Sequence, residues 1–459
     1  MPKLDISLEK AKGPHPLASH INQLLDTPEL RRARVFADIL DGFHLKNTVT
    51  TKVEGRKATI DGQDVVNFGS ANYLGLEMHP KVLEAARQAL TEWGNHSGCS
   101  RIFSSHENIV RLEERLASLV GAEASLICAN TSATHQGVVP SLFGQKGVTI
   151  FIDRYAHTSM HQAAMIAVAK GAQTGRVDVR YLNELEAKLE ACDSKIKVVM
   201  IDGVYSMQGT MPDIPRIQEI CDAHGAILYI DDAHGIAIYG ERGGGVAEHF
   251  DLSYDNMILV AGLQKGLGAY GGFVAARKSV IDFLRCTSRA YIFSGTLQPQ
   301  AVEGSLAAIE VCESDEGRAL RARLKEISMR VRERLQAMGY VVRDGDSPIV
   351  SVLIGPELKT LLAGRRLFDV GVYVNSVLYP ATPKNEGLLR ISLNAVHSDA
   401  EIETLLTAFG DLKEYLAQYR RPLGPNLDYA KEIVSRQAVR RTARVTSRVS
   451  SWMKHLGIR

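Results

Sequence analysis

The sequence predicts an α/β protein with a large domain on a mostly parallel β-sheet and a smaller α+β C-terminal domain. Short, almost wholly apolar runs alternate with amphipathic segments, which is typical of a parallel sheet covered by helices on both faces. A long helical stretch and a second set of strand-like runs then follow. The apolar runs of the first part are 124–128, 148–153, 197–202, 226–231 and 257–261.

Four segments are expected along the chain. Residues 1–60 are polar and helix-prone and form an N-terminal arm, and 61–300 form the large domain. A linking helix over about 301–338 and the small domain fill 301–420, and a basic tail follows at 421–459.

Helical patterns and a capping motif support this division. Within the large domain, helices are expected at 184–191 and 214–224. Near the end of the small domain, Ser398 and Glu401 form a capping box that opens a helix to about residue 409. Strands of the small domain are expected at 340–343, 349–354, 372–374 and 388–393.

Composition excludes several classes of protein. The chain has 459 residues, 45% hydrophobic and 23% charged, enough to bury a large core. A net charge of +2 argues against a nucleic-acid partner. Six scattered cysteines without metal-ligand spacing indicate a reducing compartment and no metal site. Without an apolar stretch of membrane-spanning length or a signal peptide, a cytoplasmic location is expected.

Two polar residues stand where predicted strands end, and ligands of such sheets bind beyond those ends. Asp231 ends one strand, and Lys265 follows another within a glycine-rich turn. A lysine there can form an imine with a planar cofactor, and a carboxylate nearby can keep a pyridine nitrogen protonated. Alone, each residue is more often a surface lysine or a capping aspartate. The ordered pair favours a cofactor site.

The motifs around these residues resemble one known family. The segment 231–240 reads D-D-A-H-G-I-A-I-Y-G, 243–250 reads G-G-G-V-A-E-H-F, and Lys265 is followed by a glycine pair at 271–272. This pattern is similar to that of the α-oxoamine synthases, which condense an amino acid with an acyl thioester and release carbon dioxide. They are fold-type-I enzymes that use pyridoxal phosphate, so the resemblance implies that fold and that cofactor. It extends from about residue 67 to residue 402.

The resemblance also implies roles on the cofactor side. Lys265 would hold pyridoxal phosphate as a Schiff base and later transfer a proton, Asp231 would pair with the pyridine nitrogen, and His234 would contact the phenolic oxygen. His157 would stack on the ring, and Ser206 would lie near it. The alternative is that His157 only forms hydrogen bonds within its own loop and does not contact a cofactor.

On the substrate side, the resemblance implies that Arg390 receives the carboxylate of the amino acid, a task that suits the guanidinium fork. Asn72 and Tyr73, in an N-Y-L-G segment, would lie on the same side. Ser294 and Thr296 would reach the phosphate in the partner subunit. A homodimer with shared active sites is therefore expected.

The sequence departs from the family pattern in three places. Gly262 replaces a threonine that binds the phosphate in the family, 128–134 replaces the S-G-Y/W-x-A-N turn, and the glycine-rich segment 94–105 is altered. Thr131 and Ser132 could supply hydroxyl groups to the phosphate at a strand-to-helix turn, where a helix dipole favours an anion. A cofactor-free, non-catalytic subunit is the alternative. What argues against it is that five residues are retained together: Lys265, Asp231, His157, His234 and Arg390.

Three short segments of the sequence indicate a class of substrates. G-V-Y-V-N at 371–375, P-A-T-P at 380–383 and R-A-Y-I-F-S at 289–294 resemble bacterial serine palmitoyltransferases. They favour L-serine and a long-chain acyl thioester, on coenzyme A or an acyl carrier protein, with a 3-keto sphingoid base as product. α-Hydroxyketone signal synthases share part of this pattern. The 8-amino-7-oxononanoate, aminolevulinate and aminoketobutyrate synthases match it less well.

The tail presents a second hypothesis. Arg436, Arg440, Arg444 and Arg448 recur every four residues, with apolar residues on the opposite helical face. This pattern is typical of an interfacial helix at an anionic membrane surface, here the inner face of the membrane. An acidic carrier protein would explain the charge equally well. A helix packed on the body or a disordered tail is the further alternative.

Overall fold

The structure is a computed structural model that describes residues 48–417 and the single positions 20, 23 and 27. Within it, Thr50–Tyr415 form one compact unit. The basic tail and most of the expected N-terminal arm lie outside the described residues. The division into four segments therefore stays a prediction.

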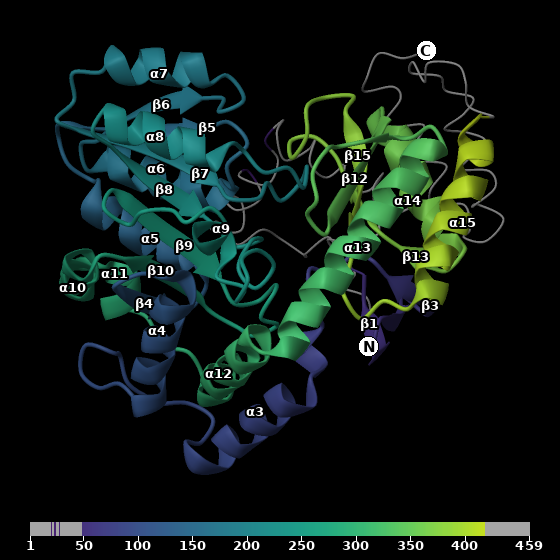
Figure 1. The fold of residues 1–459 in the computed structure, drawn as a ribbon, viewed down its shortest axis with the longest axis horizontal. Helices are drawn as coiled ribbons and strands as arrows, with labels where there is room; N and C mark the ends of the chain where they lie inside the picture. Colours follow the sequence, from purple (N-terminus) through teal and green to yellow (C-terminus); the bar gives the residue numbers. More distant parts are fainter. Residues whose placement is uncertain (1–19, 21–22, 24–26, 28–47, 418–459) are drawn as a thin grey trace. The chain divides into compact units, whose positions relative to one another are not determined.

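A seven-stranded sheet dominates the first part of the unit (Figure 1), in the order β4-β10-β9-β8-β7-β5-β6. Strand β10 runs antiparallel to both of its neighbours, and the remaining pairs are parallel. The predicted α/β fold with a mostly parallel sheet is thus confirmed. The strands are β4 (Ala124–Cys128), β5 (Val148–Asp153), β6 (Gln173–Val177), β7 (Ile196–Asp202), β8 (Ala226–Asp231), β9 (Met257–Gly262) and β10 (Gly272–Ala276).

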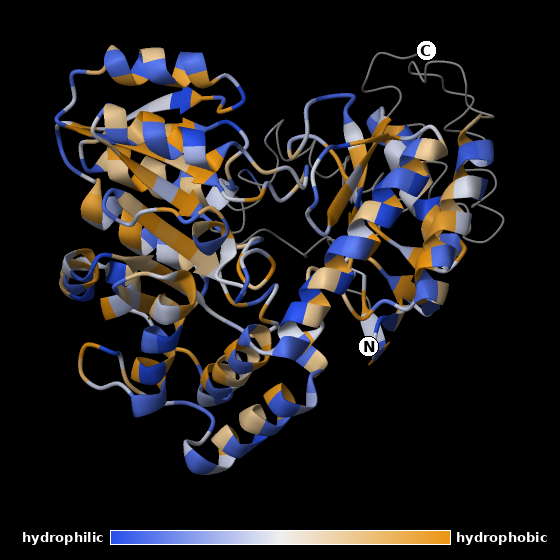
Figure 2. Cartoon of the chain, viewed as in Figure 1, coloured by the Kyte–Doolittle hydropathy of each residue, from blue (hydrophilic) through white to orange (hydrophobic). Residues whose placement is uncertain are grey.

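Helices cover this sheet, and its inner strands are mostly hydrophobic, whereas the edge strand β6 reads Q-T-G-R-V and is largely exposed (Figure 2). Because side chains alternate along a strand, Val198 and Met200 of β7 share a face. Both belong to a core cluster that includes Val138, Met160 and Leu284 from three of the helices. The helices of this part are α3 (Pro80–Glu92), α4 (Glu107–Val120), α5 (Thr131–Leu142), α6 (Thr158–Ala169), α7 (Leu182–Glu190), α8 (Ile214–Ala223), α9 (Gly245–His249), α10 (Lys278–Thr287) and α11 (Arg289–Ile292), with a 3₁₀ turn η1 (Leu76–Met78).

The linking segment is two helices, α12 (Pro299–Glu313) and α13 (Asp315–Ala337). The single helix expected over 301–338 is wrong at Ser314. This residue has extended backbone angles, with φ −79° and ψ 172°, and its hydroxyl accepts a hydrogen bond from the Gly317 amide. Its side chain therefore caps the second helix, which is the usual role of serine at such a position.

An antiparallel sheet of four strands follows, in the order β11-β12-β15-β14. The expected capping box is present, because the Ser398 amide and hydroxyl donate to Glu401 Oε2 and the Glu401 amide donates back to the Ser398 hydroxyl. None of the described helices is long and apolar enough to cross a membrane. The elements here are β11 (Val341–Val342), β12 (Ile349–Gly355), α14 (Glu357–Asp369), β14 (Asn375–Val377), β15 (Gly387–Ser392) and α15 (Asp399–Ala417).

Another four-stranded sheet joins distant parts of the chain. It consists of β1 (Thr50–Glu54), β2 (Lys57–Ile60), β3 (Gln63–Asn67) and β13 (Val372–Tyr373). The helix-prone character expected of residues 1–60 is wrong for the first two strands. In the parallel pair β3–β13, Val66 lies opposite Val372. Residues just before Asn72 and Tyr73 are thereby held against the C-terminal part of the chain.

Candidate active site

Two aspartates end neighbouring parallel strands. Asp202 of β7 lies in register with Asp231 of β8, and both are buried. Burial, followed by the negative charge of Asp231, raises the pKa of Asp202 well above its usual range. Burial acts in the same direction on Asp231, but the charge and hydrogen bond of His135 and the charge of Lys265 outweigh it and lower the pKa to about 2. Asp231 is therefore the ionised member of the pair.

Lys265 lies in the turn after β9, the strand next to β8, and is partly buried. Burial lowers the pKa of its amine from 10.5 to about 8, since the opposing attraction of Asp231 is smaller and the charge of Arg390 adds to the lowering. A lysine that is neutral in part near neutral pH is a nucleophile suited to imine formation.

His135 was not predicted as a site residue. It lies on α5, is fully buried, and places its Nε2 2.8 Å from Asp231 Oδ2. Its Nδ1 is 2.8 Å from the Tyr229 hydroxyl. The other carboxylate oxygen, Asp231 Oδ1, accepts a hydrogen bond from the Ala233 amide at 3.0 Å. Both oxygens of Asp231 thus have a partner within the protein.

Three predicted residues meet in a hydrogen-bonded chain. The Tyr73 hydroxyl is 2.7 Å from His234 Nδ1, and an Arg390 Nη2 donates to that hydroxyl at 3.4 Å. All three side chains are buried. Burial raises the pKa of Tyr73 to about 12 even though the charge of Arg390 opposes the rise, so the phenol stays neutral. Arg390 Nε is buried without a partner among the described residues.

His157 and Asn72 are placed by backbone contacts. His157 caps α6 and is exposed, with its Nδ1 2.7 Å from the Ser159 hydroxyl. Its amide donates to Asp202 Oδ1 at 3.0 Å, which holds it at the end of β7. The carbonyl of Asn72 accepts a hydrogen bond from the Asn394 side chain.

The start of α5 approaches the turn that contains Lys265. A Cβ atom built on Gly262 would lie 2.4 Å from Thr131 Oγ1 and 2.6 Å from Gln264 Oε1. The Thr131 hydroxyl therefore occupies space that a larger residue at position 262 would need. Gln264 Oε1 is buried without a partner among the described residues. Ser132, the next residue of α5, is exposed.

Three other predicted residues are not connected to this cluster by the contacts of the described chain. Ser206 is partly exposed in the loop after β7, and Ser294 and Thr296 are partly exposed after α11. The segment after α11 is instead tied to Ser100, whose hydroxyl donates to the Ile292 carbonyl at 2.6 Å. Thr296 Oγ1 is buried and has no partner among the residues that the structure describes.

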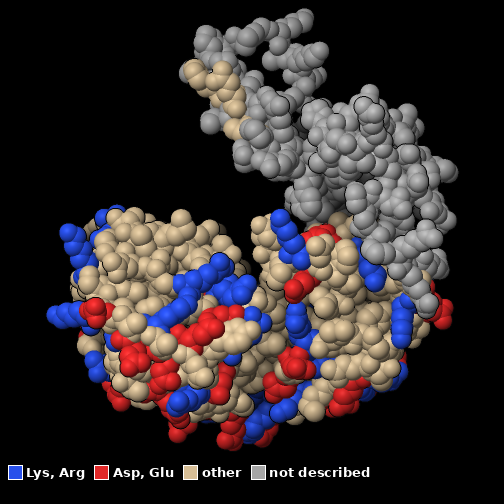
Figure 3. All heavy atoms as spheres, turned by 90° about the horizontal axis from the view of Figure 1, so that it is seen from above, with Lys and Arg blue, Asp and Glu red and all other residues tan. Residues whose placement is uncertain are grey.

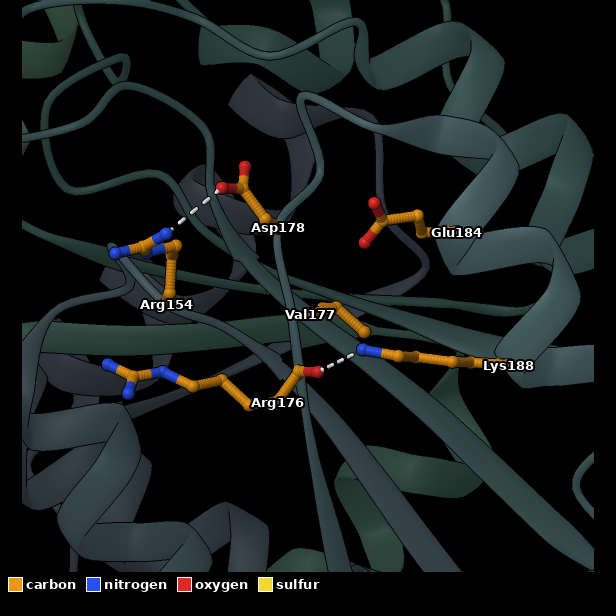
Figure 4. Close-up of a pocket in the computed structure, with 6 residues that line it drawn as sticks. All are labelled: Arg154, Arg176, Val177, Asp178, Glu184 and Lys188. Atoms are coloured by element: carbon orange, nitrogen blue, oxygen red, sulfur yellow. Dashed lines mark hydrogen bonds and ion pairs between the residues drawn. The ribbon is translucent and has the colours of Figure 1, made fainter.

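A polar hollow of about 310 Å³ lies elsewhere, at the end of the edge strand β6 (Figure 4). Arg154 pairs with Asp178 across it at 3.6 Å, and Lys188 Nζ donates to the Arg176 carbonyl at 2.7 Å. It contains no predicted site residue. On the face shown in Figure 3, basic and acidic side chains are likewise interspersed. The convergence of predicted residues, rather than this hollow, marks the candidate site.

A seven-stranded sheet with a lysine and an ionised aspartate at the ends of adjacent strands defines a pyridoxal-phosphate-dependent enzyme of fold type I. Residues 63–409 match the family described as aminotransferase class I and II, and the chain belongs to it. Within it, the chain is an enzyme of the α-oxoamine synthase type, a C-acyltransferase.

Two kinds of enzyme are among the sequence relatives. The chain is 34% identical over 377 residues to the 8-amino-7-oxononanoate synthase of Thermoanaerobacter pseudethanolicus, covering 80% of this chain and 92% of that protein. It is 33% identical over 356 residues to the serine palmitoyltransferase of Sphingobacterium spiritivorum, covering 76% and 88%. Among solved structures, the serine palmitoyltransferase of Sphingomonas wittichii superposes with a TM-score of 0.81 at 28% identity, covering 86% and 99%.

The residues present fit pyridoxal phosphate. The amine of Lys265 suits its aldehyde, and the buried carboxylate of Asp231 suits a protonated pyridine nitrogen. For the phosphate, the chain offers the N-terminus of α5, the Thr131 hydroxyl and the close approach of β10. A Cβ atom on Gly272 would lie 2.4 Å from the Thr131 amide nitrogen. Any residue larger than glycine at this position would therefore clash with the turn.

Proposed function

We propose that this enzyme joins L-serine to a long-chain acyl thioester, releasing carbon dioxide and the free thiol and giving a 3-keto sphingoid base. One observation supports this choice over the relatives that make 8-amino-7-oxononanoate. The segment that resembles serine palmitoyltransferases contains Asn375, which lies directly opposite Arg390 in the β14–β15 pair. The segment that carries the resemblance thus lies next to the residue proposed to hold the amino acid.

The same segment also contacts the substrate-side loop. A Cβ atom on Gly69 would lie 2.5 Å from the Tyr373 ring and 3.2 Å from Asn375 Nδ2. Gly69 begins the turn that leads to Asn72 and Tyr73. A change at 373 or 375 would therefore be transmitted to that turn, which gives the segment a physical route to amino-acid choice.

The roles proposed for individual residues combine the family resemblance with the contacts described above. Bound pyridoxal phosphate would act as an electron sink for negative charge at the α-carbon of the amino acid. Lys265 would hold the cofactor and then remove the α-proton, and Asp231 would keep the ring nitrogen protonated. Arg390 would hold the substrate carboxylate, a bidentate acceptor that matches a guanidinium fork. His157 would stack on the ring, and His234 would contact the phenolic oxygen.

The phosphate would be held by Thr131 and Ser132 at the start of α5, with Ser206 near the ring. Tyr73 and Asn72 would border the amino acid. The Thr131 hydroxyl supports the first role, because it fills the space beside Gly262. The departure from the family pattern at position 262 would then leave a hydroxyl in nearly the same place.

A spectroscopic titration tests the proposal. The absorbance of the holoenzyme is recorded while L-serine, L-alanine, glycine and L-threonine are added in turn, followed by acyl thioesters of several lengths. A change with L-serine alone, and carbon dioxide release only with long acyl chains, is the expected result. A response to L-alanine alone would instead favour the 8-amino-7-oxononanoate reaction.

We also propose that two chains form a homodimer in which Ser294 and Thr296 contact the partner's cofactor. Phe103 and Phe293 are 85% and 81% exposed, and the bridge between Ser100 and Gly295 brings their segments together. Such an apolar pair is unusual on a free surface. Phe293→Asp should yield monomers by light scattering, whereas Met165→Asp, at another exposed apolar site on α6, should leave the dimer intact.

The basic tail at 421–459 is proposed to bind an anionic membrane surface, which would bring the enzyme to long acyl chains. Deleting residues 426–459 should abolish binding to vesicles that contain an anionic lipid and leave condensation of a soluble acyl-coenzyme A unchanged. Unchanged vesicle binding with loss of binding to an acyl carrier protein would assign the tail to the carrier protein instead.

A further inference from the structure

His135 and Tyr229 form a buried arrangement behind Asp231. Tyr229 and Asp231 are two residues apart on β8, so their side chains point to the same face of the sheet. Helix α5 places His135 on that face, with its two ring nitrogens 2.8 Å from the Tyr229 hydroxyl and 2.8 Å from Asp231 Oδ2. His135 and Tyr229 are both fully buried, at 0% exposure.

The chemistry of the three groups fixes one direction of donation. An ionised carboxylate only accepts hydrogen bonds, so His135 Nε2 must donate to Asp231. The Tyr229 hydroxyl can donate to Nδ1 of a neutral ring or accept from Nδ1 of a protonated ring. Both ring nitrogens therefore keep a partner in either charge state. A buried ring without such partners would be costly.

We propose that His135 is a positioning residue that fixes the orientation of the Asp231 carboxylate and keeps it ionised, with Tyr229 fixing the orientation of His135. This inference rests on the proposed role of Asp231 toward the cofactor nitrogen. The other charged or titratable groups that interact with Asp231 are Lys265 from the turn after β9, Asp202 from β7, His157 from the loop after β5 and the neighbouring Asp232. Among these groups and His135, only His135 is hydrogen-bonded to the Asp231 carboxylate.

The first test uses the holoenzyme and three variants. His135→Leu removes both hydrogen bonds, whereas His135→Gln offers one donor and one acceptor of similar reach. Tyr254→Phe is the control for loss of a side-chain hydrogen bond elsewhere in the large domain, because the hydroxyl of this partly buried tyrosine donates to the Val120 carbonyl at 3.1 Å. The readouts are the dissociation constant of pyridoxal phosphate and the pH dependence of its absorbance when bound.

We expect His135→Leu to weaken cofactor binding about tenfold and to shift the pH profile, with His135→Gln within about threefold of the wild type. The control should change neither readout. Two results would overturn the proposal. One is an unchanged dissociation constant and pH profile in His135→Leu, even with a lower melting temperature. The other is equal impairment by leucine and glutamine, which would indicate a packing role.

The second test uses the apoprotein labelled with ¹⁵N-histidine, in which His135→Gln assigns the ring signal of His135. Asp231→Asn should change the chemical shift of that signal at a fixed pH, because the carboxylate that accepts its hydrogen bond is lost. An unchanged chemical shift would contradict the pairing. If the wild type bound no cofactor yet this signal moved, the proposed function would fail while the His135–Asp231 pairing stood.

Discussion

The cofactor half and the amino-acid half of the site differ in how completely the protein satisfies their polar groups. Asp231 ends a strand of the large sheet, and both of its oxygens have partners within the chain. Arg390 lies on the small sheet, and its Nε is buried without a partner among the described residues. The first half is therefore organised in advance, whereas the second retains hydrogen-bonding capacity for a ligand carboxylate.

Replacing Lys265 with alanine tests the organised half and should have the largest effect. Turnover should fall by about 10⁴-fold, since both imine formation and α-proton removal are assigned to this amine. Binding of the amino acid by Arg390 should persist. Carbon dioxide release in single-turnover experiments measures the change. Lys278→Ala, an exposed lysine paired with Asp282, is the control. Retained condensation would contradict the assignment of Lys265.

The pH dependence of apoprotein stability is a second test of the cofactor half, again through Lys265. The folded pKa of about 8 lies below the ordinary value of 10.5, so the unfolded chain binds more protons between these values and stability should rise with pH there. Lys265→Met cannot titrate. It should be more stable than the wild type by about 3 kcal/mol at pH 7, since one pKa unit corresponds to about 1.4 kcal/mol, and the difference should vanish near pH 10.5. Urea unfolding at several pH values measures it. A difference that is independent of pH would be inconsistent with the lowered pKa.

Replacing Arg390 with lysine tests the amino-acid half. Lysine keeps the charge but loses the planar fork, so KM for L-serine should rise about 30-fold. The cofactor spectrum without amino acid should stay unchanged, because Arg390 is not proposed to hold the cofactor. Arg343→Lys, on the same small domain and paired with Glu386, is the control. A changed cofactor spectrum would show that the two halves are not separable.

Replacing Tyr73 with phenylalanine should have the smallest effect. The hydroxyl links the halves, since it contacts His234 on one side and Arg390 on the other. Loss of these hydrogen bonds should reduce kcat/KM about fivefold. Steady-state kinetics with L-serine measures it. A far larger loss would assign the hydroxyl a part in the chemistry itself.

Much of the large sheet could be predicted because its strands are short apolar runs. The bounds of β4, β5 and β8 agree with the runs in the sequence. Strand β10 was not predicted, since Gly272–Ala276 is short and begins with a glycine whose role is a close approach to α5. The break at Ser314 was missed because a capping serine also occurs within helices.

The residues of the candidate site likewise divide into those that the sequence predicts and those that it does not. Residues in family motifs, such as Lys265 and Asp231, could be predicted from the sequence. His135 could not, because its partners on β8 are about a hundred positions away and nothing in α5 marks it. One signal was available in part: Tyr229 and Asp231 share a strand face, so a polar partner opposite them was to be expected.

The pairing of β3 with β13 has a consequence for synthesis of the chain. The turn with Tyr73 is held by later residues: the Ser392 amide donates to the Phe68 carbonyl at 2.7 Å and the Ala395 amide to the Tyr73 carbonyl at 2.8 Å. The N-terminal part of the site is therefore synthesised long before the C-terminal residues that hold it in place. A chain that stopped after α12 would lack Arg390 and leave Tyr73 without its supports. The amino-acid half of the site would consequently form later in synthesis than the cofactor half.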